Sequence, residues 1–96
     1  MEIILFVERS MLREVEDRLL KDDLVSRANI ISRDSHPFRE GGFYIRVLGS
    51  DEQCIRAKEL VHDMAEEVVG KEREDVLKAI KEEDEKMLSG FSGIFK

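Results

Sequence analysis

Residues 42–53, Gly42-Phe43-Tyr44-Ile45-Arg46-Val47-Leu48-Gly49-Ser50-Asp51-Glu52-Gln53, predict a strand, a tight turn and the start of a helix. Phe43, Ile45 and Val47 alternate with their neighbours, and this period of two is typical of a strand with two distinct faces. Gly49 allows the chain to turn. The rest of the chain is organised around this unit.

Ser50 and Gln53 indicate where the helix begins. The Ser50 hydroxyl can accept a hydrogen bond from the Gln53 amide, while the Gln53 side chain can reach back to the Ser50 amide, which is a capping box. The apolar positions that follow have helical spacing. They predict one helix up to residue 69, with an apolar face made of Cys54, Ala57, Val61, Met64, Ala65, Val68 and Val69.

The remaining segments complete a β-α-β-β-α order in a single domain, 1–96. The sequence predicts a strand at 2–8, an amphipathic helix from Met11 to about Lys21, a strand at 28–33 and a loop at 34–42. Such an order predicts a two-layer α+β domain with a small, mostly antiparallel sheet, helices on one face and strand 43–48 in the middle. A long C-terminal helix follows, with a break at Gly70.

Both faces or both edges of the first strand are expected to be covered, as in an interior strand, because Ile3 to Val7 are all apolar. This strand would nevertheless keep one open edge. Residues 71–96 form a helical extension with an apolar tail at 89–96. We expect the tail to fold back onto the domain, to add a short edge strand beside the first strand, or to dock into another subunit.

The composition limits the class of protein. The net charge is −6 with 40% charged residues, which opposes diffuse attraction to nucleic acid or to anionic membranes. The dense charge and the scarcity of amide side chains resemble thermophile proteins. A single cysteine, Cys54, and the lack of a long apolar run predict a cytoplasmic protein without a membrane span.

Part of the chain, 28–69, resembles a K-homology (KH) RNA-binding domain. The resemblance rests on Ala28-Asn29-Ile30-Ile31-Ser32-Arg33, on Tyr44-Ile45-Arg46-Val47-Leu48-Gly49-Ser50-Asp51-Glu52-Gln53 and on Ala57-Lys58-Glu59-Leu60-Val61. It implies a hairpin leading into a capped helix. The Gly-x-x-Gly loop with which that family clamps a nucleic-acid backbone is missing, because no glycine occurs between Ser10 and Glu40.

The hairpin is the best candidate for contact with an anionic partner, because it is a positive segment in an acidic protein. Guanidinium groups bind phosphate or carboxylate with two hydrogen bonds, and an aromatic ring can stack on a base. The alternative is that these arginines pair with Asp34, Glu40 and helix carboxylates as an ordinary charged surface. The candidate residues for anion or RNA binding are Arg33, His36, Arg39, Tyr44 and Arg46.

A second candidate surface is the apolar stripe of the C-terminal helix and tail. So thin a sheet has little surface to bury it, and exposed apolar patches usually mark interfaces. We therefore expect a homodimer. The candidate interface residues are Val76, Leu77, Ile80, Met87, Leu88, Phe91, Ile94 and Phe95.

No catalytic, metal or cofactor site is expected. His36 lacks a nucleophile or an orienting acid at readable spacing, and His62 lacks further metal ligands. Cys54 lies on an apolar helix face, where a buried cysteine is typical. Two hypotheses remain: a non-catalytic module that binds RNA or another anionic partner through the hairpin, and a protein-interaction or structural subunit that acts through the C-terminal helix and tail.

Overall fold

The computed structural model describes the backbone of residues 1–94 and the side chains of residues 1–83. Within it, the strands β1 (Glu2–Glu8), β2 (Asn29–Asp34), β3 (Gly42–Leu48) and β4 (Ala65–Glu67) form one sheet in the order β2-β3-β1-β4. The helices are α1 (Leu12–Lys21), α2 (Asp51–Val61) and α3 (Gly70–Ile94), with short 3-10 turns at Arg9–Met11 and Val25–Arg27. No helix in the described residues is long and apolar enough to cross a membrane.

The sheet is antiparallel throughout, and β3 lies between β2 and β1 as predicted. Together with the order β1-α1-β2-β3-α2-β4, this is the arrangement called ferredoxin-like, or split β-α-β. The α+β class predicted from the sequence is confirmed.

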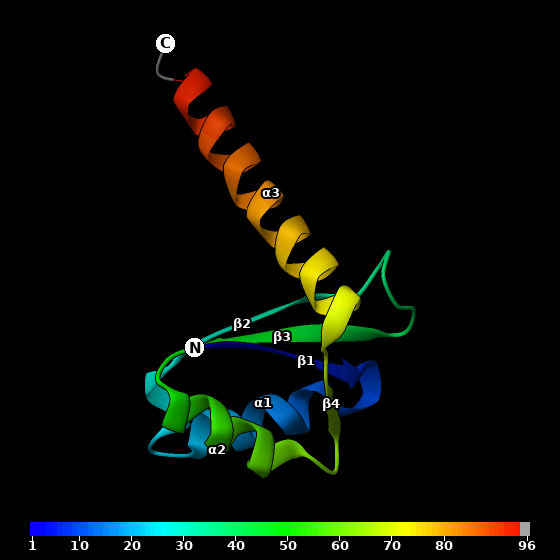
Figure 1. Cartoon of the computed structure of the whole chain (residues 1–96), viewed down its shortest axis with the longest axis vertical. Coiled ribbons are helices and arrows are strands. Elements are labelled where there is room, and N and C mark those ends of the chain that lie inside the picture. The colour runs from blue at the N-terminus through cyan, green and yellow to red at the C-terminus, as the bar shows by residue number, and fades with distance from the viewer. Residues whose placement is uncertain (95–96) are drawn as a thin grey trace.

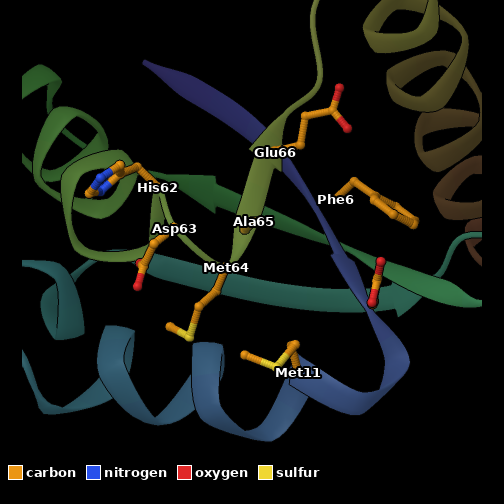
Figure 2. Close-up of a pocket in the computed structure, with 8 residues that line it drawn as sticks. Phe6, Met11, His62, Asp63, Met64, Ala65 and Glu66 are labelled. Atoms are coloured by element: carbon orange, nitrogen blue, oxygen red, sulfur yellow. The ribbon is translucent and has the colours of Figure 1, made fainter.

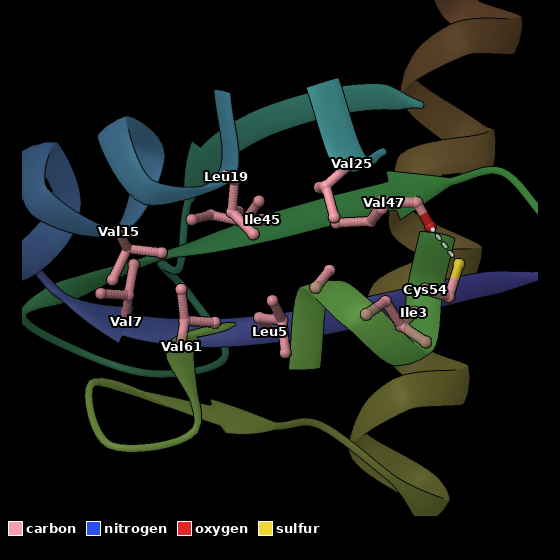
Figure 3. Packing of buried hydrophobic residues seen from close by; sticks show 11 residues of the cluster. Ile3, Leu5, Val7, Val15, Leu19, Val25, Ile45, Val47, Cys54 and Val61 are labelled. Carbon is pink, nitrogen blue, oxygen red and sulfur yellow. Dashed lines mark hydrogen bonds between the residues drawn. The ribbon is translucent and has the colours of Figure 1, made fainter. Parts of the chain in front are cut away.

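The main core lies between the sheet and the helices α1 and α2, which cover one face (Figure 1). Ile3, Leu5 and Val7 of β1 point into it, because alternate residues of a strand share a face. Figure 3 shows them packed against side chains from β3, α1 and α2. The other buried members are Val15, Leu19, Val25, Ile45, Val47, Cys54, Ala57 and Val61.

A second, smaller core lies on the opposite face, beneath the first turns of α3. Ile4 and Tyr44 come from the sheet, and Val68 and Val76 cover them. The prediction of helices on one face holds for α1 and α2, and the long C-terminal helix α3 covers part of the other face. The apolar run of β1 is explained, because this strand has cover on both faces and a neighbour on both edges.

The open edge of β1 is paired by β4, which the sequence analysis had placed inside the second helix. Helix α2 ends at Val61, and Arg18 of α1 donates a hydrogen bond to the Leu60 carbonyl oxygen at 3.0 Å. The chain then turns, and the Val68 amide donates to the Ile4 carbonyl oxygen at 2.8 Å. The unpaired edge of β1 thus stabilises an extended segment whose own apolar spacing favours a helix.

Helix α3 begins at Gly70, whose φ of +65° is a left-handed conformation that glycine adopts without strain. The predicted break at Gly70 is thus the start of a separate helix. Residues 89–94 continue α3, so this part of the tail adds no edge strand beside β1. Figure 1 shows α3 running away from the sheet, and we call residues 84–94 the arm.

Candidate functional site

Three of the five predicted anion-binding residues lie together on the face of the sheet that α3 covers. Arg33 of β2 is paired with Tyr44 of β3, and Ile31 of β2 is paired with Arg46 of β3. Arg33, Tyr44 and Arg46 line one cavity of about 130 Å³. Ile31, Ile80 and Glu83 complete its lining, and we call it the β2–β3 cavity.

The Arg33 guanidinium has partners on two sides. Its Nη2 lies 3.0 Å from a Glu83 carboxylate oxygen of α3, and its Nε donates to the Asp34 carbonyl oxygen at 3.3 Å. Its Nη1 is buried and has no hydrogen-bond partner among the residues that the structure describes. This unpaired donor is unusual, because buried polar groups are nearly always hydrogen-bonded.

The Arg46 side chain is held by Glu2, the first residue of β1. Its Nε forms an ion pair with the Glu2 carboxylate, and both side chains are largely buried. Arg73 of α3 donates to the Glu2 carbonyl oxygen at 2.6 Å, which ties the helix to the same strand end. The Arg46 charge is therefore compensated by a residue of β1.

Arg39, in the loop between β2 and β3, belongs to a different cluster, which we call the latch: Arg39, Tyr44, Glu66 and Glu72. Arg39 donates from Nε and Nη2 to the two Glu72 oxygens at 2.7 and 2.8 Å, and from Nη1 to Glu66 at 2.8 Å. The Tyr44 hydroxyl donates to Glu72 Oε2 at 2.7 Å. The Arg39 guanidinium also lies 4.5 Å from the centre of the Phe6 ring, within range of a cation–π contact.

The latch shifts the pKa of its members. Hydrogen bonds from Arg39 lower the pKa of Glu72 against the opposing effect of burial, and they lower the pKa of Glu66. Burial, followed by the nearby Glu72 carboxylate, raises the pKa of Tyr44 well above its ordinary value. The latch therefore contains a guanidinium, two carboxylates and a neutral phenol at neutral pH.

His36, the fifth predicted residue, is separate from both clusters. It is exposed at the hairpin tip, and its Nδ1 lies 3.2 Å from a carboxylate oxygen of Glu40. Its backbone amide donates a hydrogen bond to Asp34 Oδ1 at 2.8 Å. The predicted hairpin residues thus divide into a cavity group, a latch residue and an exposed histidine, with Tyr44 shared by cavity and latch.

Each of the predicted arginines has a carboxylate partner, as the sequence alternative supposed. Two of these partners, Glu72 and Glu83, are helix carboxylates as that alternative supposed, while Glu2 and Glu66 come from β1 and β4. Asp34 and Glu40 form no ion pair with these three arginines among the described side chains. The Tyr44 side chain is fully buried, so its ring is not available for stacking on a base. RNA binding by the hairpin stays a prediction, and any RNA would have to compete with these glutamates.

A larger open groove of about 430 Å³ lies beside β4 (Figure 2). Met11 and Met64 point toward one another across it, while His62 and Glu66 point in different directions. The Nδ1 of His62 lies 3.1 Å from the carbonyl oxygen of Glu59 in its own helix. The described side chains contain no group of three metal-ligating residues, here or elsewhere.

Cys54 is buried in the main core, where burial raises the pKa of its thiol. Its Sγ lies 3.7 Å from the Val47 carbonyl oxygen (Figure 3). A protonated thiol held by a backbone carbonyl is a packing residue, as the sequence indicated.

The predicted interface residues are described only in part. Val76 is buried, and Leu77 and Ile80 pack against the smaller core. The described side chains end at residue 83 and the described backbone ends at residue 94. The side chains of four further predicted interface residues therefore fall outside the description: Met87, Leu88, Phe91 and Ile94. Phe95 lies outside the described residues altogether.

Comparisons of the chain with protein-family models, with curated proteins and with solved structures find no match.

Proposed function

We propose that this protein is an assembly module that pairs with a second copy of itself through the arm of α3. The single observation that carries the proposal is the direction of α3, which runs away from the sheet while its sequence places Met87, Phe91 and Ile94 at helical spacing (Figure 1). The ferredoxin-like body would then be the platform that presents the arm.

The spacing of apolar residues supports this proposal. Leu77 and Ile80 pack on the smaller core, and positions 84, 87, 91 and 94 continue the same three- and four-residue spacing. Residues with this spacing share one face of a helix, and a sustained pattern of this kind is typical of helices that pair. The face that holds α3 to the sheet therefore continues into the arm.

The dimensions of the arm also favour pairing. Eleven residues of helix, 84–94, extend over roughly 16 Å. Four of these residues, Met87, Leu88, Phe91 and Ile94, are large and apolar. Contact with a second arm would remove this surface from water.

Asp84 favours an antiparallel pair. It occupies one of the positions of the apolar spacing, so a parallel pair in register would bring two like charges together. In an antiparallel pair each Asp84 would lie opposite another part of the partner arm. A twofold axis would relate the copies, as in most homodimers.

Sedimentation equilibrium of the full chain tests the proposal. We expect a mass of twice 11.1 kDa for the natural sequence and the monomer mass for Phe91→Asp, which would bury a charge in the pairing face. Ser89→Asp is the matched control, because position 89 falls on the opposite side of the helix, and it should leave the dimer intact.

A natural chain that sediments as a monomer at every concentration up to the millimolar range would overturn the proposal. So would a dimer that both aspartate variants weaken equally, because the effect would then come from charge and not from the face.

A further inference from the structure

We infer that the β2–β3 cavity is a binding site for a small carboxylate, a role independent of the pairing of the arms. The cavity is about 130 Å³ and is lined by two arginines, one glutamate and three bulky side chains with apolar surface. Cationic donors beside apolar walls suit a ligand with a carboxylate head and a short hydrocarbon body.

The first donor is Arg33. Its side chain is 19% exposed, and its buried Nη1 has no partner among the described residues. A guanidinium stays charged at all ordinary pH values and binds carboxylates with two parallel hydrogen bonds. Because Glu83 uses Nη2 and Asp34 uses Nε, Nη1 is the donor left for a ligand oxygen, which would reach this buried atom once the Arg33 side chain turns toward the cavity.

The second donor is Arg46, which lies diagonally across the β2–β3 pair from Arg33. Its ion pair with Glu2 uses Nε, so its terminal nitrogens remain for the other ligand oxygen. Arg33 and Arg46 thus line the cavity from neighbouring strands.

The walls limit the ligand to a small one. Ile31, Ile80 and the Tyr44 ring are apolar, and the Tyr44 hydroxyl is already bonded to Glu72. A cavity of roughly 150 Å³ accommodates a molecule the size of benzene, so this cavity suits a monocarboxylate of about six heavy atoms. A nucleic-acid backbone is far too large to enter.

Glu83 lies at the rim, and its side chain is 59% exposed. It would repel a carboxylate while competing for Arg33. Removing its charge should therefore strengthen binding, which is the opposite of what loss of a contact residue would do. An increase in ligand affinity on removal of the Glu83 charge therefore distinguishes a ligand site from a structural ion pair.

Titration of the ¹⁵N-labelled full chain with butyrate, followed by NMR, tests the inference. We expect saturable shifts at Ile31, Arg33, Tyr44 and Arg46, and none with butyramide, which is the neutral analogue. Arg33→Gln should weaken binding at least tenfold and Glu83→Gln should strengthen it several-fold. Arg13→Gln removes the same charge from an exposed position on α1 and should leave the affinity unchanged.

Ile31→Phe provides a test that leaves every charge in place, because it fills the cavity from β2 and should abolish the response. If Arg33→Gln does not fold, Ile31→Phe still tests whether butyrate binds in the β2–β3 cavity. Inorganic phosphate distinguishes the ligand class: saturation by phosphate and not by butyrate would overturn the carboxylate assignment. No saturable shift with butyrate, or equal weakening by Arg13→Gln and Arg33→Gln, would overturn the site itself.

Discussion

Glu72 accepts hydrogen bonds from two residues far away in the sequence, the Arg39 guanidinium and the Tyr44 hydroxyl. An ionised carboxylate with two such donors is strongly held, and hydrogen bonds to charged groups stabilise more than neutral ones. Removal of the carboxylate would leave a partly buried guanidinium and a buried hydroxyl with fewer partners.

The pKa of Glu72 gives this contact a pH dependence. Because its pKa is lower in the folded state than the ordinary value of 4.5, the contact stabilises the fold above that value. The stabilisation is lost as the pH falls through the folded-state pKa, when the carboxylate takes up a proton. Glu66 acts in the same direction through Arg39.

We therefore expect Glu72→Gln to be less stable than the natural chain at pH 7, by about 1–3 kcal/mol. The difference should shrink as the pH falls below 4.5, because the natural carboxylate then becomes neutral as well. Urea unfolding at pH 7, 5 and 3 measures this. Glu14→Gln, at an exposed position of α1, is the control. A difference that stays constant over this pH range would contradict the role of Glu72.

At the residue scale, the sequence singled out the arginines and the general class of helix carboxylates as their partners, but it did not identify the individual glutamates. Arg33, Arg39 and Arg46 are recognisable because they lie in one positive segment. Glu2, Glu72 and Glu83 come from β1 and α3, and no local pattern distinguishes them from the other carboxylates. Only the packing of α3 on the sheet brings them to the hairpin.

At the scale of elements, the start of α2 is the clearest success of the sequence analysis. The Gln53 amide donates to Ser50 Oγ at 3.2 Å, and the Ser50 amide donates to Gln53 Oε1 at 2.9 Å. Both halves of the predicted capping box are present. A cap is predictable because all its atoms lie within four consecutive residues.

Loss of this cap has a defined cost. We expect Ser50→Ala to lower the free energy of unfolding by about 1 kcal/mol, since the Gln53 amide loses its acceptor. Ser50→Asp keeps an acceptor at the same position and should remain close to the natural stability. Denaturant unfolding followed by circular dichroism compares the three proteins. Equal destabilisation by Ala and Asp would show that the hydroxyl does not act as a cap.

Strand β4 shows where local reasoning fails. Ala65-Glu66-Glu67 consists of residues that favour helices, and the apolar positions around it continue the spacing of α2. Its extended form depends on β1, where Leu5 pairs with Glu67 and Val7 pairs with Ala65. The deciding contacts are more than fifty residues away in the sequence, which places them outside any local pattern.

At the scale of the whole molecule, the described buried residues all lie between Ile3 and Val76. Helix α3 contacts the rest of the chain through Glu72, Arg73 and Glu83 as well as through the buried Val76. The first turns of α3 therefore close the smaller core, and the backbone of its later part extends away from the sheet (Figure 1).

A chain shortened to residues 1–83 should consequently remain folded, with a melting temperature within about 4 °C of the full chain when both are monomeric. A chain shortened to 1–69 should lose stability severely, because it exposes Ile4 and Tyr44 and removes Glu72 from the latch. Thermal unfolding at low protein concentration distinguishes the two. Collapse of the 1–83 chain would mean that the arm belongs to the folded body.

The latch connects two segments that are far apart in the sequence, the loop between β2 and β3 and the start of α3. Glu72 lies in the first turn of α3, and Arg39 lies in the loop at the hairpin tip, so one carboxylate joins the start of α3 to that loop. A partner that tilts the arm would strain Glu72 and hence Arg39. Assembly at one end of the molecule would thereby be communicated as a movement at the other.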